Sequence, residues 1–157
     1  MYITLESDYA VRIVAVLCKS MKKMDAKTIS EQATVSLRFS LKILRKLVAA
    51  NIVRSSKGTQ GGYTINMEPK DITLKMVFEA TEGTYYFSRC LAPEGICNRE
   101  MSGKCVFQKA FCDITKSVRE KLNEYNFADM LAQENECLKE KANAVSQEKE
   151  GTNFTAE

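Results

Sequence analysis

The succession of two short helical patterns and a glycine-rich hairpin between residues 28 and 65 constrains the fold of this 157-residue chain more than any other feature. Thr28-Ile-Ser-Glu31 has the form of a capping box, which predicts a short helix that begins at Thr28 and ends near Ala33. After a break at residues 34–36, apolar residues recur at helical spacing as far as Ala50, at Leu37, Leu41, Leu44 and Val48. Two helices joined by about three residues are typical of a helix-turn-helix.

A β-hairpin is predicted directly after the second helix. The segment 52–56 is short and β-branched at its start, residues 57–62 hold three glycines, and residues 63–65 return as a second strand. Upstream, apolar residues between Asp8 and Met21 follow a helical period and predict a helix with one buried face. Helix, turn, helix and hairpin in this order predict a mainly α fold with a small β-hairpin wing, which is a winged helix-turn-helix.

The basic charge of the chain is confined to this part of the sequence. Residues 1–66 carry 11 Lys and Arg against 4 Asp and Glu, a net charge of +7, whereas residues 67–157 carry 12 against 16, a net charge of −4. A basic helix followed by a hairpin suits double-stranded DNA, because the helix can enter the major groove and the hairpin can approach phosphates. An ordinary solvated basic surface is the alternative. The expected DNA contacts are Ser36, Arg38, Phe39, Lys42, Arg45 and Lys46 of the second helix, and Lys57, Gly58, Thr59, Gln60, Gly61, Gly62 and Tyr63 of the wing.

Three cysteines lie near one another further along a chain that contains no histidine. Cys90, Cys97 and Cys105 are separated by six and seven residues in a stretch that also holds Pro and Gly, so their thiolates can converge on one centre. Iron–sulfur clusters are held mainly by thiolates, whereas zinc sites usually show closer Cys pairs. The spacing favours an iron–sulfur cluster over zinc and leaves a purely structural role open. Cys112 falls within a predicted helix and is the weaker candidate.

A long amphipathic helix is predicted over residues 106–125. Its apolar side is formed by Val106, Ala110, Ile114, Val118 and Leu122, and a helix this apolar on one side must pack on another surface. We expect that surface to belong to a partner subunit, with packing inside the chain as the alternative. The predicted division is a winged helix-turn-helix over residues 1–83, a cysteine-bearing cluster loop over 84–105, a dimerisation helix over 106–133 and a disordered tail over 134–157, where large apolar residues are few.

Other functional classes find little support in the residues. Histidine is absent, no Cys-x-x-Cys pair occurs and no clear paired-carboxylate or nucleophile motif is present, so we do not expect an enzyme. The apolar run from Ala10 to Cys18 is interrupted by Arg12 and is too short to span a bilayer, and acidic residues precede it. We therefore expect a cytoplasmic protein with no membrane contact, whose cysteines are reduced or bind metal.

Four stretches together resemble a bacterial family of winged-helix regulators, the one that includes IscR, NsrR and CymR. They are Met1-Tyr-Ile-Thr with Asp8-Tyr-Ala, Ile29-Ser-Glu through Val35-Ser-Leu, the wing Gly58-Thr-Gln-Gly-Gly-Tyr63, and the cysteine triplet. The resemblance covers about residues 1–133. It implies a homodimeric transcription factor, usually a repressor, whose cluster state sets its affinity for a palindromic operator.

The resemblance also bears on the fourth ligand of such a cluster. An IscR-like set would place a histidine where Gln108 stands, and a neutral amide is a poor iron ligand. An NsrR-like set takes an aspartate of the first helix, and Asp8 occupies the matching position, reaching across from the partner chain. The implied site is a 4Fe–4S cluster, with 2Fe–2S as the other possibility, held by Cys90, Cys97, Cys105 and Asp8. Cys112 is the alternative fourth ligand, and Asp8 could instead only complement the positive end of its helix.

The expected function is a DNA-binding transcriptional regulator that senses nitric oxide, redox state or iron–sulfur status through a labile cluster. An oxygen ligand and an incomplete thiolate shell would leave one iron open to nitric oxide or oxidants, which suits a sensor. A regulator of the same fold that uses bare thiols or zinc is the alternative.

Overall fold

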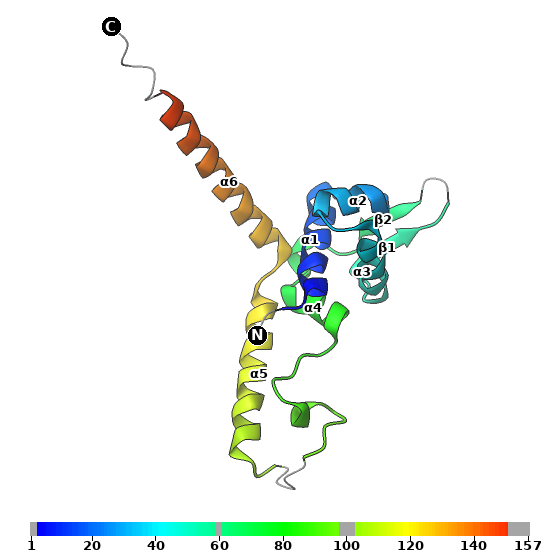
Figure 1. The fold of residues 1–157 in the computed structure, drawn as a ribbon, viewed down its shortest axis with the longest axis vertical. Helices are drawn as coiled ribbons and strands as arrows, with labels where there is room; N and C mark the ends of the chain where they lie inside the picture. The colour runs from blue at the N-terminus through cyan, green and yellow to red at the C-terminus, as the bar shows by residue number, and fades with distance from the viewer. Residues whose placement is uncertain (1–2, 59–60, 98–102, 151–157) are drawn as a thin grey trace.

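The structure is a computed structural model that describes residues 3–58, 61–97 and 103–150, the last nine by their backbone alone. Six α-helices and one two-stranded antiparallel sheet form its described part (Figure 1). In chain order the elements are α1 (Leu5–Ser20), α2 (Ala26–Ala33), α3 (Leu37–Ala49), β1 (Val53–Ser56), β2 (Gly62–Ile65), the 3-10 turn η1 (Pro69–Asp71), α4 (Leu74–Glu82), the 3-10 turn η2 (Arg89–Leu91), α5 (Val106–Glu124) and α6 (Phe127–Glu150). The predicted mainly α winged helix-turn-helix is confirmed.

The first helices begin where a side chain accepts hydrogen bonds from free backbone amides. Thr4 caps α1 and accepts from the N–H of Ser7. Asp25 caps α2 by accepting from the N–H groups of Lys27 and Thr28, so this helix begins two residues before the predicted start at Thr28. The Thr28 hydroxyl itself donates to Asp25, because a charged carboxylate is the stronger acceptor.

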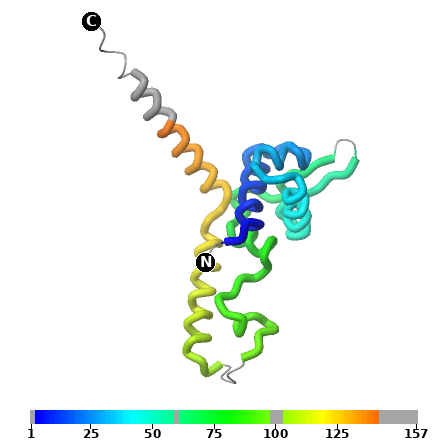
Figure 2. Tube along the Cα trace, in the orientation of Figure 1, coloured from blue at the N-terminus to red at the C-terminus, as the bar shows by residue number. Residues whose placement is uncertain are grey.

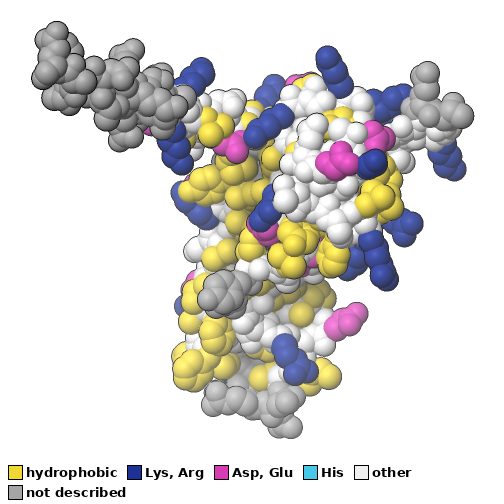
Figure 3. Space-filling model, turned by 45° about the horizontal axis from the view of Figure 1, so that its top comes forward, with side chains coloured by type: hydrophobic (Ala, Val, Ile, Leu, Met, Phe, Trp, Pro, Cys, Tyr) yellow, Lys and Arg dark blue, Asp and Glu magenta, His cyan; other side chains and the backbone are white. Residues whose placement is uncertain are grey.

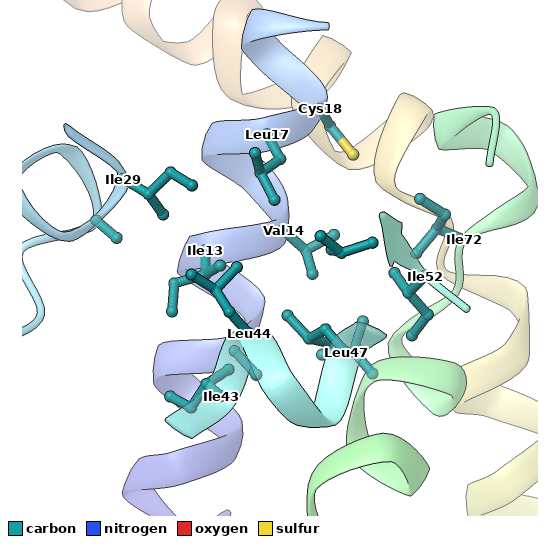
Figure 4. Packing of buried hydrophobic residues seen from close by; sticks show 14 of the residues in the cluster. Ile13, Val14, Leu17, Cys18, Ile29, Ile43, Leu44, Leu47, Ile52 and Ile72 are labelled. Carbon is teal, nitrogen blue, oxygen red and sulfur yellow. The ribbon is translucent and has the colours of Figure 1, made fainter. Parts of the chain in front are cut away.

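A single hydrophobic core lies between α1 and the elements around it (Figure 4). Ile13, Val14 and Leu17 of α1 are fully buried and face buried side chains of α2, α3 and the segments that follow them. Burying each such side chain stabilises the fold by about 1.5–3 kcal/mol. The other fully or almost fully buried large side chains are Ile29, Ile43, Leu44, Leu47, Ile52, Val53, Ile72, Val77 and Phe127. This core fixes α3 with its opposite face toward solvent.

The hairpin is held against the body by one additional bridge. Val53 pairs with Ile65 and Ser56 with Gly62 in the antiparallel register of β1 and β2. The backbone of Tyr63 exchanges two hydrogen bonds with Met24, at 3.0 and 2.8 Å, which form an isolated antiparallel bridge beside β2. The strands β1 and β2 extend away from the helices, as the trace in Figure 2 shows.

The predicted dimerisation helix over residues 106–133 is divided into two helices. Asn126 accepts a hydrogen bond from the N–H of Asp129 and so begins α6. Phe127 inserts into the core with 1% of its side chain exposed, and its N–H donates to the carbonyl of Ile72. The junction between α5 and α6 is therefore fixed to the winged-helix body.

The structure shows helix over the predicted tail as far as Glu150. Helix α6 continues to that residue and projects away from the body (Figure 1). Glu, Lys and Ala make up ten of the 17 residues from 134 to 150, and these residues favour helix even where few apolar side chains are available to pack. Residues 151–157 lie outside the described part. Among the described helices, none combines the length and the apolar composition that a membrane span requires.

Candidate functional site

The open face of α3 carries cations around a shallow apolar hollow. Arg38, Lys42 and Arg45 are exposed. Together with Leu37, Phe39 and Leu41 they line a surface hollow of about 820 Å³.

The ring of Phe39 is held edge-on against Tyr9 with 5.8 Å between centroids, and the Lys42 ammonium lies 5.7 Å from the Phe39 centroid. Ser36 is exposed and caps this helix through the N–H of Phe39. These side chains form the face that a DNA groove could meet.

Lys46, which we expected on this face, is held inward by two partners. Its ammonium forms an ion pair with Glu6 at 2.8 Å and donates to the carbonyl of Thr81 at 2.6 Å. Lys42 pairs with the other oxygen of Glu6 at 2.9 Å but keeps a more exposed side chain. The bond from Lys46, opposed by partial burial and assisted by Lys42, lowers the pKa of Glu6. Glu6 therefore stays charged at the edge of α3.

The hairpin supplies the second part of the basic surface. Lys57 and Gly58 are exposed near its tip, whereas Gly61, Gly62 and Tyr63 are half-buried where β2 returns to the body. Thr59 and Gln60, also expected to contact DNA, lie outside the described residues. Dark blue Lys and Arg side chains stand out from the surface on the side of the hairpin in Figure 3.

The structure explains why position 62 is a glycine, which the sequence alone did not show. A Cβ atom at this position would stand 2.7 Å from the backbone oxygen of Met24 and 3.1 Å from its carbonyl carbon. Only glycine lets the hairpin come this close to residue 24. Gly62 is therefore needed to place the wing, whatever else it contacts.

The three predicted cysteine ligands line one hollow beside the first turns of α5. Cys90, Cys97 and Cys105 border a space of about 640 Å³, together with Phe107, Gln108 and Phe111. The sulfur of Cys90 lies 3.1 Å from the hydroxyl of Ser88. Cys105 stands at the N-cap position of α5. The loop thus brings thiols from three separate turns of chain to one place.

Gln108 joins two sides of this loop. Its side-chain oxygen accepts from the N–H of Gly103 at 3.1 Å, and its side-chain nitrogen donates to the carbonyl of Cys90 at 3.3 Å. The amide therefore has a structural role at the position where a histidine ligand would stand in an IscR-like set.

The donor set fits a metal cluster in kind, because three thiols border one hollow and thiolates are the usual ligands of iron–sulfur clusters. Within the described ranges, however, no three Cys, Asp or Glu side chains are already grouped as a metal site would require. The sulfurs would have to move toward one another on binding.

The two candidate fourth ligands lie elsewhere in the same chain. Asp8 is on α1 and forms an ion pair with Arg12 at 2.7 Å, and Figure 1 shows α1 beside the opposite end of α5 from the cysteine loop. Cys112 is exposed and borders a different hollow, beside Lys75 and Tyr86. The three loop cysteines therefore border one hollow in the structure, and neither Asp8 nor Cys112 borders it.

Sequence reasoning missed Glu6. Its partners Lys42 and Lys46 are 36 and 40 positions away along the chain, so no local pattern could pair them. The only signal was an acidic residue in the first turn of a helix, a place where acids are common.

Comparison with known proteins adds a family to this geometry. The family described as Rrf2, iron-dependent transcriptional regulator, matches residues 3–133. A putative HTH-type transcriptional regulator, rrf2-like, of Rhodobacter capsulatus is 29% identical over 87% of this chain and 97% of its own length. The HTH-type transcriptional regulator NsrR of Bacillus subtilis is 22% identical over 88% of this chain and 96% of its own length.

Solved structures share the fold. IscR of T. potens has a TM-score of 0.68 at 24% identity, covering 87% of this chain and 90% of that protein. CymR of B. subtilis, described as the global cysteine regulator, has a TM-score of 0.62 at 21% identity, covering 85% and 98%. The matched region runs through the hairpin, the cysteine loop and all of α5.

Proposed function

This chain belongs to the Rrf2 family of transcriptional regulators, and from that premise we propose that it is a repressor that senses nitric oxide, redox state or iron–sulfur status through an iron–sulfur cluster. The family and the relatives are transcriptional regulators. This chain is likewise a DNA-binding transcriptional regulator and not an enzyme. The proposal concerns how it reads DNA, how it pairs with a second copy and what it senses.

For DNA reading, we assign α3 to the major groove and the hairpin to the flanking phosphates. Two observations support this assignment. The side chains of Arg38, Lys42 and Arg45 are exposed, and no element among the described residues covers them. Arginine and lysine at base edges and phosphates are the usual means of binding a duplex. Lys57 at the wing would add one phosphate contact.

We propose that α5 packs on a second copy of the chain. Its apolar side chains are largely exposed, with Val106 at 74%, Phe107 at 60% and Ile114 at 44%. Hydrophobic side chains (yellow) gather along the edge of the molecule that α5 forms (Figure 3). A twofold dimer would present two α3 helices to half-sites about one helical turn apart, which suits a palindromic operator.

For sensing, we assign a 4Fe–4S cluster to Cys90, Cys97 and Cys105, with Asp8 of the partner subunit as the fourth ligand. The shared hollow of the three thiols is the observation that carries this assignment. Asp8 would exchange its ion pair with Arg12 for the metal. When bound, such a cluster supplies an iron with an oxygen ligand that nitric oxide or oxidants can attack. This chain would contribute the thiolates, and α4 would lead from the loop to the DNA reader.

A thiol-based or zinc regulator on the same scaffold is the second candidate. Two observations favour the thiol-based form: the donors in the described ranges are not grouped as a metal site, and the Cys90 sulfur already has a hydroxyl neighbour. Reversible oxidation of an accessible thiol would then carry the signal.

The test is an anaerobic absorption spectrum with iron and sulfide analysis, before and after nitric oxide, on the wild type, Asp8→Ala and Cys112→Ser. Visible absorption with bound iron and sulfide, altered in Asp8→Ala but not in Cys112→Ser, is the expected result. A colourless protein that takes up no iron on reconstitution would exclude the cluster and leave the thiol or zinc regulator. A spectrum altered only in Cys112→Ser would move the fourth ligand to Cys112.

The DNA assignment is tested separately by titration of duplex DNA at matched salt. Arg38→Ala and Lys42→Ala should weaken binding, and Lys57→Ala should lower the slope of log affinity against log salt by about one. Lys139→Ala, which removes a similar charge from α6 far from α3, is the matched control. If both α3 substitutions leave affinity unchanged, α3 is not the reading helix.

A further inference from the structure

We infer that Glu6 acts as a brake on DNA binding: its carboxylate competes with a backbone phosphate for the Lys42 ammonium, and its position is set by the end of α4 beside the cysteine loop. This inference rests on the proposed assignment of α3 to DNA. It names a regulatory residue outside both the reading face and the cysteine hollow.

The two oxygens of Glu6 are divided between two lysines of α3. Oε2 pairs with Lys42 at 2.9 Å and Oε1 with Lys46 at 2.8 Å, while the Glu6 side chain is 19% exposed. Lys46 is also bonded to the carbonyl of Thr81, so it has a reason to stay. Lys42 has a 56% exposed side chain and stands beside Arg38 and Arg45 on the open face. Of the two lysines, Lys42 is therefore the one that a phosphate can take.

A phosphate and a carboxylate cannot both hold this ammonium without approaching each other. DNA that meets the open face of α3 brings phosphates to the edge where Glu6 lies, and like charges at that distance repel. Lys42 then leaves Glu6, which keeps Lys46 as its partner. Because the Glu6 carboxylate cancels one positive charge at this edge of α3, the net release of counterions, which drives much of the affinity for a duplex, is smaller by about one cation.

The position of Glu6 depends on contacts between the first turn of α1 and the last turn of α4. The hydroxyl of buried Ser7 lies 2.8 Å from that of Thr81 and also bonds Glu82, whose carboxylate accepts from Thr4 at 2.7 Å. Burial raises the pKa of Glu82, and the bonds from Ser7 and Thr4 outweigh it, so the net pKa is lowered and the acceptor stays charged.

Helix α4 ends directly after these contacts. Gly83 follows Glu82 with a φ of 78°, and the chain then enters the segment that carries the cysteines. A change in the loop that shifts the last turn of α4 would move Thr81 and Glu82, and with them Glu6 and Lys46. The strength of the ion pair between Glu6 and Lys42 would then depend on the conformation of the cysteine loop.

An ordinary structural role for Glu6 predicts the opposite sign. If the carboxylate only fixed α3 in place, its neutralisation would loosen the helix and weaken DNA binding. If it competes for Lys42, its neutralisation frees a cation for DNA and strengthens binding. The direction of one affinity change therefore separates the two roles.

The experiment compares wild type and Glu6→Gln in binding a mixed-sequence duplex of about 30 base pairs, long enough for two half-sites one helical turn apart. Salt is varied from about 50 to 200 mM, the range over which phosphate contacts change affinity strongly. We expect Glu6→Gln to bind about two- to five-fold more tightly at the low-salt end, the size of an exposed ion pair. The salt slope should steepen by about 0.9, the value of one added phosphate contact.

Two control variants make the test specific. Glu140→Gln makes the same charge change on α6, away from α3, and should leave affinity and slope unchanged. In a Lys42→Gln background, Glu6→Gln should have no strengthening effect, because the cation that it frees is gone. Glu6→Asp, which keeps the charge on a shorter side chain, should shift affinity in the same direction by less, and it carries the test if Glu6→Gln does not fold.

Each outcome has one meaning. The inference that Glu6 weakens DNA binding is overturned if a folded Glu6→Gln binds DNA more weakly than wild type or equally tightly. It is also overturned if Glu6→Gln strengthens DNA binding equally in the Lys42→Gln background. Neither result would contradict DNA binding by α3. Failure of the wild type itself to bind the duplex overturns the proposed DNA assignment instead.

Discussion

Replacing Gly62 by alanine should separate the hairpin from the body of the protein. The new Cβ would stand 2.7 Å from the oxygen and 3.1 Å from the carbonyl carbon of Met24, distances at which one of the two backbones must shift. The atoms concerned belong to main chain and not to a flexible side chain, so the clash cannot be relieved by a change of rotamer. The two hydrogen bonds between Met24 and Tyr63, at 3.0 and 2.8 Å, are the contacts that the shift would lengthen first.

The magnitude follows from either way of relieving the clash. If the strands stay paired, the strain of an inserted methyl group costs about 1–3 kcal/mol. If they separate, two hydrogen bonds of about 0.5–1.5 kcal/mol each are lost, which comes to the same range. For a chain of this size, each kcal/mol lowers the melting temperature by about 2–4 °C.

The assay is urea unfolding followed by circular dichroism, together with duplex titration. Ser55→Ala is the matched control, because Ser55 is exposed on β1 opposite Tyr63 and its loss should change the free energy of unfolding by at most about 0.5 kcal/mol. Gly62→Ala should also flatten the salt dependence of DNA binding, since the wing carrying Lys57 would be displaced. A free energy of unfolding within about 0.5 kcal/mol of wild type would refute the reasoning, because it would mean that the close approach to Met24 constrains nothing.

Three further results are expected. Burial raises the pKa of the Cys18 thiol to about 12, so iodoacetamide at pH 8 should leave Cys18 unmodified in the folded protein while the exposed Cys112 and Cys137 react, as peptide mass spectrometry would show. The lowered pKa of Glu6 stabilises the fold above the ordinary glutamate value of 4.5, so the difference in free energy of unfolding between wild type and Glu6→Gln should be full near neutral pH and disappear as the pH falls through the lowered value. Phe127→Ala should cost about 3–5 kcal/mol in urea unfolding, since this side chain is 1% exposed in the core, and a loss below about 1 kcal/mol would place it outside the core.

The fold was predictable from sequence where local pattern and burial agree. The apolar spacing of α1, α3 and α5 predicted those helices, because each has one face that the period of the helix brings together. Prediction failed where two signals competed. Thr28 satisfied a capping box, but Asp25 three residues earlier is the stronger acceptor and caps α2. In the tail, the scarcity of apolar residues indicated disorder, whereas helix propensity carries α6 to Glu150.

The candidate site was predictable only in its residue types. Cysteines without histidine pointed to thiolate chemistry, and Cys90, Cys97 and Cys105 do border one hollow. The inward attachment of Lys46 was not predictable, because its partner Glu6 and the carbonyl of Thr81 come from segments that meet only in the folded chain. A basic helix read from sequence gives the number of cations on it, but not which of them are already paired.

That distinction bears on how a cysteine loop could control a DNA reader at the other end of the molecule. Glu6 and Asp8 are two residues apart in the first turn of α1, and at about 100° per residue their side chains point to different sides of the helix. Glu6 faces α3 and the end of α4, whereas Asp8 reaches solvent beside Arg12. If Asp8 serves a partner's cluster as proposed, ligation would act on the same turn that positions Glu6. Ligation of Asp8 and movement of α4 would then both shift the first turn of α1, and with it the Glu6 carboxylate that pairs with Lys42. Substituting Asp8 should accordingly change the salt slope of DNA binding in the cluster-loaded protein but not in the cluster-free protein, whereas Glu6→Gln should change it in both.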